Sequence, residues 1–282
     1  MTPSVQLSDT SAFVILLMSD GIHVSKNSQR YMDMLDLSCG IDLLKDCTRV
    51  WPHLGEIVLN RKSTILQEVK FMMQDGAEQV IIFGSGMDAL SLEITSLNNT
   101  VQVYEVDAHH MKHKQQLLNK AMQSTHNITC ITADLNQPSR VISKIADAGW
   151  DKNRQSVLIF EGISYYLKSE TLWEIIRQFS SCAANHVIVE YMVPSDMIDA
   201  ERAHIPDDVF GIIQNSLPDN LRINRFGYDT IVQNVRIMGG SDIRRHTMSS
   251  IEKRRTGTNR IFPTESSGWI EVACFKTAPV EL

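Results

Sequence analysis

The sequence has no cysteine cluster, no membrane-length apolar run and no excess of basic charge. Its five cysteines are scattered and include no C-x-x-C pair, which argues against a disulfide framework and favours a reducing compartment. The apolar stretch at residues 12–18 is too short to span a bilayer and lacks the basic start of a signal peptide, so we expect a buried helix there. A net charge of −6 argues against nucleic acid as the main partner. These absences predict a soluble, cytoplasmic protein that acts neither on a membrane nor on nucleic acid.

What is present is an ample supply of core residues. Hydrophobic residues make up 43% of the 282 positions, and neither a repeat nor a low-complexity linker divides them, so we expect one large domain. Residues 1–75 have a mainly helical pattern, including a helix at 59–73, and would form an N-terminal cap. Residues 76–191 would form the core, and residues 192–282 a substrate-side insertion with edge strands.

Strand-like and helix-like stretches alternate through the core. Short runs rich in β-branched residues predict five strands, at 79–83, 100–106, 128–132, 156–160 and 186–191. Helices between them imply right-handed crossovers and a doubly wound, mostly parallel α/β sheet. Beyond residue 191 the pattern is less regular. There it predicts a helix at 196–216 and strands at 221–226, 230–238 and 269–275, which an antiparallel edge would accommodate.

The first predicted strand runs directly into a glycine turn, Gly84-Ser85-Gly86. Glycine allows a positive φ in the turn and lets a ligand approach the backbone. Such turns also serve simply to connect a strand with a helix, and nicotinamide dinucleotides use them too. The turn alone therefore does not identify a ligand.

Carboxylates follow the next strands at the same edge of the sheet. Glu105 and Asp107 end the second strand about 20 residues past the glycines, where a carboxylate commonly holds ribose hydroxyls. Asp134 follows the third strand and could accept a hydrogen bond from an adenine amino group. Glu161 follows the fourth strand, and Glu190 ends the fifth together with Tyr191. Acidic residues in this series predict one adenosyl-binding crevice.

The runs QVIIFGSGMDALSL, VYEVD, ADL and LIFEGISYYL resemble the leucine carboxyl methyltransferase family, whose motifs read approximately QVVxLGAGxDT, FEVD, DL and xxEGxxxYL. The resemblance covers about residues 60 to 190. It implies a Rossmann-like class I methyltransferase with a seven-stranded sheet. S-adenosylmethionine would be the cofactor and S-adenosylhomocysteine the product.

The resemblance also implies roles for individual residues. The glycine turn would line the methionine part of the cofactor. Glu161 would face the amino group of this part, and Arg61 would bind its carboxylate. Asp107 would hold the ribose, and Asp134 and Leu135 would flank adenine. The planar guanidinium of Arg61 suits a carboxylate, although a solvated charge on the helix exterior is an equal alternative. The sequence departs from the family at Ser85 and Ala89, where alanine and threonine are usual, and lacks a clear basic residue in the N-terminal helix.

Methyl transfer from a sulfonium is an in-line displacement, so the protein mainly has to align the reactants and exclude water. Tyr165 and Tyr166 are candidates to orient the acceptor, and Tyr166 aligns with the tyrosine of the family's YL motif; each could equally be a packed aromatic. His204 or His246 could serve as a base if the acceptor is an alcohol. No metal is predicted. His109 and His113 have zinc-compatible spacing, but the lysines at 112 and 114 point to a solvated helix face.

The favoured function is O-methylation of a hydroxyl or carboxylate on a small molecule or carrier-bound metabolite, as in secondary metabolism. Carboxyl methylation of a protein C-terminus is the alternative within the class. A nicotinamide-dependent oxidoreductase and a non-catalytic binding module are the alternatives outside it. The basic segment 244–260 is most simply solvated surface, and a sharper hypothesis makes it a docking patch for an acidic carrier protein.

Overall fold

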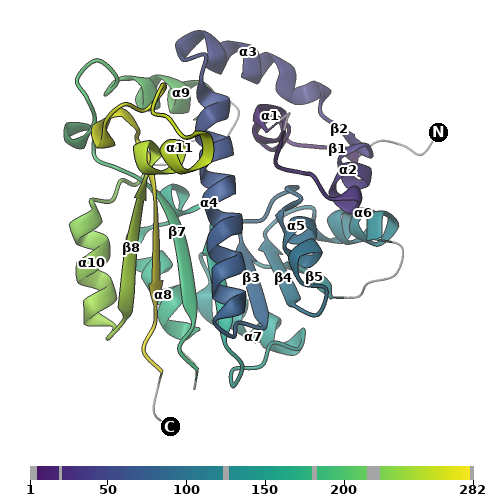
Figure 1. Ribbon diagram of the computed structural model, residues 1–282. Helices are drawn as coiled ribbons and strands as arrows, with labels where there is room; N and C mark the ends of the chain where they lie inside the picture. The colour runs from purple at the N-terminus through teal and green to yellow at the C-terminus, as the bar shows by residue number, and fades with distance from the viewer. Residues whose placement is uncertain (1–4, 19–20, 123–126, 180–182, 215–222, 280–282) are drawn as a thin grey trace.

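The computed structural model describes residues 5–18, 21–122, 127–179, 183–214 and 223–279 (Figure 1). Its central feature is a seven-stranded sheet with the order β5-β4-β3-β6-β7-β9-β8. The strands are β3 (Gln79–Phe83), β4 (Gln102–Asp107), β5 (Ile128–Thr132), β6 (Ser156–Phe160), β7 (His186–Met192), β8 (Ser241–Thr247) and β9 (Ile270–Lys276). Strands β3 to β7 pair in parallel, whereas β9 runs antiparallel between β7 and β8. The predicted doubly wound sheet with an antiparallel edge is confirmed.

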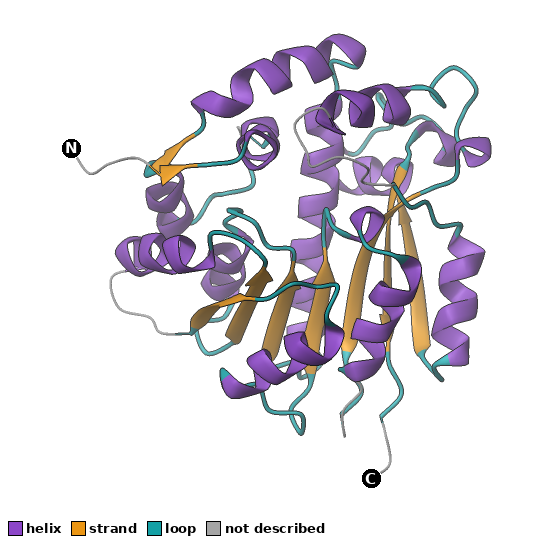
Figure 2. Cartoon of the chain, turned by 180° about the vertical axis from the view of Figure 1, so that it is seen from behind, coloured by secondary structure: helices purple, strands orange, loops and turns teal. Residues whose placement is uncertain are grey.

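Helices cover both faces of the sheet, as Figures 1 and 2 show from opposite sides. Val80 and Ile82 of β3 share one buried cluster with residues of α4 (Leu54–Gln74) and α5 (Leu90–Leu97). Ile81 and Phe83 share the other cluster with residues of α7 (Pro138–Asp147) and α8 (Ser169–Gln178). This alternation explains why most positions of these strands are apolar, since each face is covered. The helices are α4 (Leu54–Gln74), α5 (Leu90–Leu97), α6 (Met111–Met122), α7 (Pro138–Asp147), α8 (Ser169–Gln178), α9 (Ile205–Gln214), α10 (Tyr228–Ile237) and α11 (Met248–Thr256).

The N-terminal segment forms a cap at the end of the sheet where the glycine turn lies. It contains the short parallel pair β1 (Val5–Gln6) and β2 (Leu35–Asp36), and the helices α1 (Asp9–Leu17), α2 (Lys26–Met32) and α3 (Ile41–Val50). The apolar stretch at 12–18 lies largely in α1 and buries Ala12, Phe13 and Ile15, as predicted. Within the described part of the chain, no helix has the length and apolar character needed to cross a bilayer.

The C-terminal predictions are only partly correct. The strand predicted at 269–275 is β9, and the helix predicted at 196–216 is confined to α9. The segment 230–238 is not a strand but helix α10, because Ile231 and Val235, one helical turn apart, are both buried. No strand forms at 223–226, and residues 221 and 222 lie outside the described ranges. Strand β8 was not predicted.

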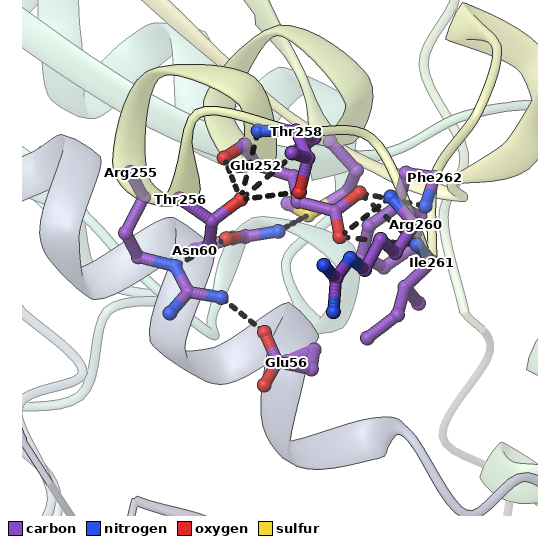
Figure 3. A network of polar contacts seen from close by, with 10 residues as sticks. Glu56, Asn60, Glu252, Arg255, Thr256, Thr258, Arg260, Ile261 and Phe262 are labelled. Carbon is purple, nitrogen blue, oxygen red and sulfur yellow. Dashed lines mark hydrogen bonds and ion pairs between the residues drawn. The ribbon is translucent and has the colours of Figure 1, made fainter.

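The basic segment 244–260 forms β8, α11 and the loop after it. Arg244 pairs with Glu68, Arg245 with Glu271, Arg254 donates to Thr64, and Arg255 contacts both Asn60 and Glu56. Figure 3 shows Arg255 reaching from α11 to α4. Four of these arginines therefore help to hold the C-terminal elements in place. Docking of an acidic carrier on this segment stays a prediction.

Glu252 of α11 fixes the loop that follows the helix. Its buried carboxylate accepts hydrogen bonds from the backbone N–H groups of Arg260, Ile261 and Phe262, at distances of 2.8–3.3 Å (Figure 3). Phe262 then packs against Trp51, with ring centroids 5.8 Å apart. This ring contact connects the loop to the end of α3 in the N-terminal cap.

Candidate functional site

A cavity of about 470 Å³ lies at the carboxyl ends of β3, β4 and β6, with α1 and α4 forming its other walls. Nine of the predicted site residues line it: Arg61, Gly84, Ser85, Gly86, Glu105, Asp107, Glu161, Tyr165 and Tyr166. Thr10, Ser11, Val14 and Ile15 of α1 face it from the cap. The topology thus gathers segments from five distant parts of the sequence around one space.

Asp134 does not line this cavity. It borders a second cavity of about 260 Å³ together with Ala108, Gln137, Arg140 and Lys144. Both cavities border the end of β4 and the loop after it, because Asp107 lines the first and Ala108 the second. The Asp134 carboxylate accepts hydrogen bonds from Asn136 and Gln137 of its own turn. Leu135 is buried and lines neither cavity. The adenine contacts of these two residues stay a prediction.

Hydrogen bonds fix the glycine turn from both sides. The N–H groups of Gly84 and Ser85 donate to the Val106 carbonyl at 2.8 and 3.2 Å. The Gly86 N–H donates to Asp107 Oδ2 at 3.0 Å. Gly84 and Gly86 have φ values of 65° and 46°, in the left-handed region that glycine adopts without strain. A Cβ on Gly84 would lie 2.7 Å from a side-chain carbon of Ile163, so this position also requires glycine for space.

The two carboxylates at the end of β4 have different surroundings. Glu105 is fully buried and its Oε2 lies 2.5 Å from Lys114 Nζ. Asp107 is half-buried, and its Oδ1 accepts a hydrogen bond from the His109 N–H at 3.0 Å. Asp107 is therefore the one placed to contact a ligand hydroxyl, whereas Glu105 serves as the counter-ion of a buried lysine.

Lys114 was expected on a solvated helix face and is instead buried, so that prediction is wrong. Besides its pair with Glu105, its ammonium donates to the Ser85 carbonyl at 3.2 Å. The helical pattern carries a signal for this burial, since Lys114 lies three residues after Met111 and three before Leu117, both buried. His109 is exposed, as the solvated-face interpretation requires, and it also lines the cavity.

A cluster of five charged side chains lies at the cavity, and four of them, all but Glu190, line it. Arg61 of α4 contacts Glu161 at 3.2 Å and Glu190 at 3.1 Å. Lys62, the next residue, contacts Asp88 at 2.8 Å and Glu161 at 2.6 Å. All but Asp88 have side chains less than a tenth exposed. The alternative that Arg61 is a solvated charge is therefore excluded.

Burial and mutual pairing act in opposite directions on these groups. Burial raises the pKa of Glu190, although the Arg61 guanidinium opposes this effect. Burial also favours the neutral form of Asp88, but the positive charges around it, with Lys62 foremost, together outweigh burial and lower the pKa of this carboxyl. The pKa values of Arg61 and Lys62 are both raised because their carboxylate partners outweigh burial. The two cations are therefore held in their charged forms.

Lys62 and Asp88 were not predicted as site residues. Each had a sequence signal, since Lys62 adjoins Arg61 and Asp88 follows the glycine turn in the motif that carries the resemblance. Glu190 was expected at the crevice, but it is fully buried and does not line the cavity. It contacts residues that do, since it pairs with Arg61 and its Oε2 accepts a hydrogen bond from the Gly162 N–H at 2.7 Å. Tyr191, the next residue of β7, points to the other face of the sheet and donates to Glu271.

Tyr165 and Tyr166 line the cavity and also form an aromatic group with Phe210 of α9. The two tyrosine rings have centroids 4.8 Å apart in an edge-on arrangement, and Tyr165 lies 5.3 Å from Phe210. Burial raises the pKa of both hydroxyls, to well above 10.0 for Tyr165. Both hydroxyls are therefore neutral near pH 7, so each can donate a hydrogen bond to a ligand and neither is suited to act as a base.

The two histidines considered as bases lie away from the cavity. His204 is exposed, and neither it nor His246 lines the space. His246 is buried with Glu68 and Cys274, and potential ligand atoms of these three residues lie within 4.8 Å of one another. The Arg244 guanidinium, 2.6 Å from Glu68 Oε2, supplies the positive charge beside this carboxylate. We therefore interpret the cluster as a buried polar contact between α4 and the sheet edge.

Several solved structures that share this fold are described as methyltransferases. A DUF574 family protein from Streptomyces avermitilis superposes with a TM-score of 0.69 at 12% identity, covering 95% of this chain and 97% of that one. A putative methyltransferase from Thermobifida fusca gives 0.67 at 13% identity, with 93% and 97% covered. The magnesium protoporphyrin IX methyltransferase of Synechocystis, crystallised with S-adenosylhomocysteine, gives 0.51 at 14% identity, with 86% and 95% covered. These likenesses establish a Rossmann-like methyltransferase fold.

The sequence comparisons establish the family. No curated protein sequence matches the chain. The model of the family described as leucine carboxyl methyltransferase matches residues 22–180, which is more than half of the chain. That match includes the glycine turn, the charged cluster up to Glu161, and both tyrosines. The chain therefore belongs to the leucine carboxyl methyltransferase family.

Proposed function

We propose that this chain is an O-methyltransferase that modifies a hydroxyl or carboxylate of a small molecule or carrier-bound metabolite. The methyl donor is S-adenosylmethionine, in keeping with the family and with a neighbour of the same fold that was crystallised with S-adenosylhomocysteine. One observation carries the proposal. A single cavity brings together the glycine turn, Asp107, two neutral tyrosines and four members of the charged cluster, Arg61, Lys62, Asp88 and Glu161.

The cavity fits the donor in size and charge. Its volume lies within the range of about 300–1,000 Å³ that small-molecule sites occupy. Counted as ionised, the charged residues that line the cavity are four carboxylates (Asp88, Glu105, Asp107 and Glu161) and two cations (Arg61 and Lys62), a net charge of −2. The donor has a carboxylate, an ammonium and a sulfonium, a net charge of +1. The wall and the ligand are therefore complementary.

Residues of this chain would hold the donor at two ends. Asp107, fixed by the backbone N–H groups of Gly86 and His109, presents a carboxylate suited to ribose hydroxyls. Glu161 faces the cavity from the loop after β6 and suits an ammonium group. Gly84 and Gly86 leave the backbone open for close approach. S-adenosylmethionine, when bound, supplies an electrophilic methyl group whose transfer to oxygen leaves the sulfur as a thioether.

The tyrosines favour a carboxylate as the acceptor. A hydroxyl acceptor has to lose its proton during transfer and so benefits from a base, whereas a carboxylate is already deprotonated. Tyr165 and Tyr166 are neutral donors that can bind and orient a carboxylate oxygen but cannot take a proton from a hydroxyl. Alignment and the exclusion of water then supply most of the rate. A carboxylic acid is accordingly the first acceptor class to test.

The test is a turnover assay with S-adenosylmethionine, read by mass spectrometry as one added methyl group. Small carboxylic acids, small alcohols or phenols, an acyl-carrier-bound acid and a peptide with a free C-terminal leucine would be compared. Methylation of small or carrier-bound acceptors supports the proposal, whereas methylation of the peptide alone would assign the chain to protein carboxyl methylation. Tyr166→Phe is the matched variant. We expect kcat to fall about tenfold with little change in S-adenosylhomocysteine binding, since one donor to the acceptor is lost.

A further inference from the structure

The resemblance to the family implies that Arg61 binds the carboxylate of the cofactor, but the contacts of Arg61 point to a different role. Its Nε faces Glu161 Oε1 at 3.2 Å and its Nη1 donates to Glu190 Oε1 at 3.1 Å. Glu190 is fully buried on a central strand, and its other oxygen accepts the Gly162 N–H. Moving Arg61 away from Glu190 would leave a buried carboxylate without its counter-ion, which is costly.

Lys62 has partners that can be exchanged more easily. Its ammonium lies 2.6 Å from Glu161 Oε2 and 2.8 Å from Asp88 Oδ2. The Asp88 side chain is 19% exposed, compared with 6% for Glu161 and 0% for Glu190. Asp88 also accepts the Leu90 N–H at 2.7 Å through its other oxygen, so it keeps a partner if Lys62 turns away. An ammonium has three N–H donors on a flexible stem and can therefore re-aim.

We propose that Lys62, rather than Arg61, binds the carboxylate of the cofactor's amino-acid part, and that Arg61 is a positioning residue for Glu161 and Glu190. The proposal rests on the assignment of the cavity to S-adenosylmethionine. Without the ligand, Lys62 and Glu161 pair with each other and so satisfy the two charges that the ligand's carboxylate and ammonium would otherwise satisfy. When the ligand binds, its carboxylate takes the Lys62 ammonium and its ammonium takes Glu161 Oε2, so Lys62 and Glu161 each keep an opposite charge while Asp88 keeps the Leu90 N–H.

This arrangement also explains a departure from the family pattern. The N-terminal helix α1 contributes Thr10, Ser11, Val14 and Ile15 to the cavity and none of these carries a charge. Among the described residues that line the cavity, Lys62 and Arg61 are the only lysine and arginine. A second cation therefore comes from α4 itself, one residue beyond Arg61, and not from the N-terminal helix.

Isothermal titration calorimetry with two ligands tests the proposal. The ligands are S-adenosylhomocysteine and its decarboxylated analogue, which differ only in the carboxylate. We expect Lys62→Gln to weaken S-adenosylhomocysteine binding about 10- to 100-fold and to change binding of the analogue by less than about threefold. Arg61→Lys, which keeps the charge, should weaken both ligands to a similar extent because it disturbs Glu161 and Glu190.

The opposite pattern would overturn the proposal: Lys62→Gln retains the wild-type preference for S-adenosylhomocysteine, and Arg61→Lys loses it. Should Lys62→Gln bind neither ligand, the double variant Lys62→Met/Asp88→Asn decides, because it removes the ion pair as a unit. It must bind the two ligands about equally, and a retained preference contradicts the proposal. Failure of the assigned function is distinguishable, because wild-type protein would then bind neither ligand.

Discussion

The ammonium of Lys114 lies 2.5 Å from the carboxylate of Glu105 in a space closed to solvent, and it also donates to the carbonyl of Ser85. This buried ion pair thereby contacts the backbone of the glycine turn and helps to hold it in place. Burial raises the pKa of Glu105 while Lys114 opposes the shift, so the carboxylate depends on this lysine for its charge. Tyr31 supports the next part of the turn by donating to the Met87 carbonyl at 3.0 Å.

Lys114→Met is expected to lower the free energy of unfolding by about 3–5 kcal/mol, because it leaves Glu105 buried without its counter-ion. The double variant Lys114→Met/Glu105→Gln should recover much of this loss, since both charges are then removed. Urea denaturation of the two variants and the wild type provides the measurement. Equal stabilities for the single variant and the wild type would mean that the pair does not support the turn.

The two glycines of the turn should respond differently to alanine. In Gly84→Ala the new Cβ meets Ile163 at 2.7 Å and φ is 65°, so we expect more than about 2 kcal/mol of destabilisation. In Gly86→Ala the nearest atom is Ser11 Oγ at 3.9 Å, and the cost is limited to about 1–2 kcal/mol of backbone strain. Its methyl group nevertheless occupies the cavity. Thermal unfolding should therefore separate the two variants, while calorimetry should show weakened S-adenosylhomocysteine binding in both.

Charge reversal in the basic segment distinguishes packing from docking. Arg255 donates to Asn60 at 2.8 Å and pairs with Glu56, whereas Lys253 on the same helix is exposed. Arg255→Glu should lower stability by about 1–3 kcal/mol, and Lys253→Glu should change it by less than about 0.5 kcal/mol. Denaturant unfolding and the acceptor KM would be measured for both. A KM that rises in both variants, with stability unchanged, would favour docking of an acidic carrier.

His186 should make stability depend on pH. Burial, reinforced by the Lys276 ammonium, lowers its pKa from 6.5 to about 4. The folded protein therefore holds a neutral imidazole in a range where the unfolded chain protonates it. The stability that it contributes is complete above about pH 6.5 and is lost as the pH falls toward 4, by at most about 3 kcal/mol.

The matched variant is His186→Gln, which does not titrate. Between about pH 6.5 and 5, urea denaturation should show a steeper loss of stability in the wild type than in this variant. Parallel curves for the two proteins would show that His186 titrates alike in the folded and unfolded states.

Much of the fold could be predicted from local pattern. Strands β3 to β7 are covered on both faces, so β-branched runs such as QVIIF reveal them directly. Strand β8 could not be found in this way, because it is an edge strand whose arginines are satisfied by Glu68 and Glu271 from distant segments. Helix α10 was mistaken for a strand because its Thr-Ile-Val sequence has high β propensity, which packing against the sheet overrides.

The site residues also fall into those that local sequence could predict and those that it could not. Residues that follow strands, such as Asp107 and Glu161, could be placed together because parallel strands end at one edge. The cations that pair with the carboxylates could not be predicted from the sequence. Lys62 and Lys114 lie on helices, and their burial depends on tertiary partners. The separate cavity beside Asp134 likewise depends on the shape of the loop after β4.

A crystal structure of the protein with S-adenosylhomocysteine tests the central claim most directly. We expect the ligand in the cavity bounded by the glycine turn, with its ribose at Asp107, its amino group at Glu161 and its adenine directed toward Asp134. Density for the ligand in any other place, with Gly84, Asp107 and Glu161 making no contact to it, would contradict the account.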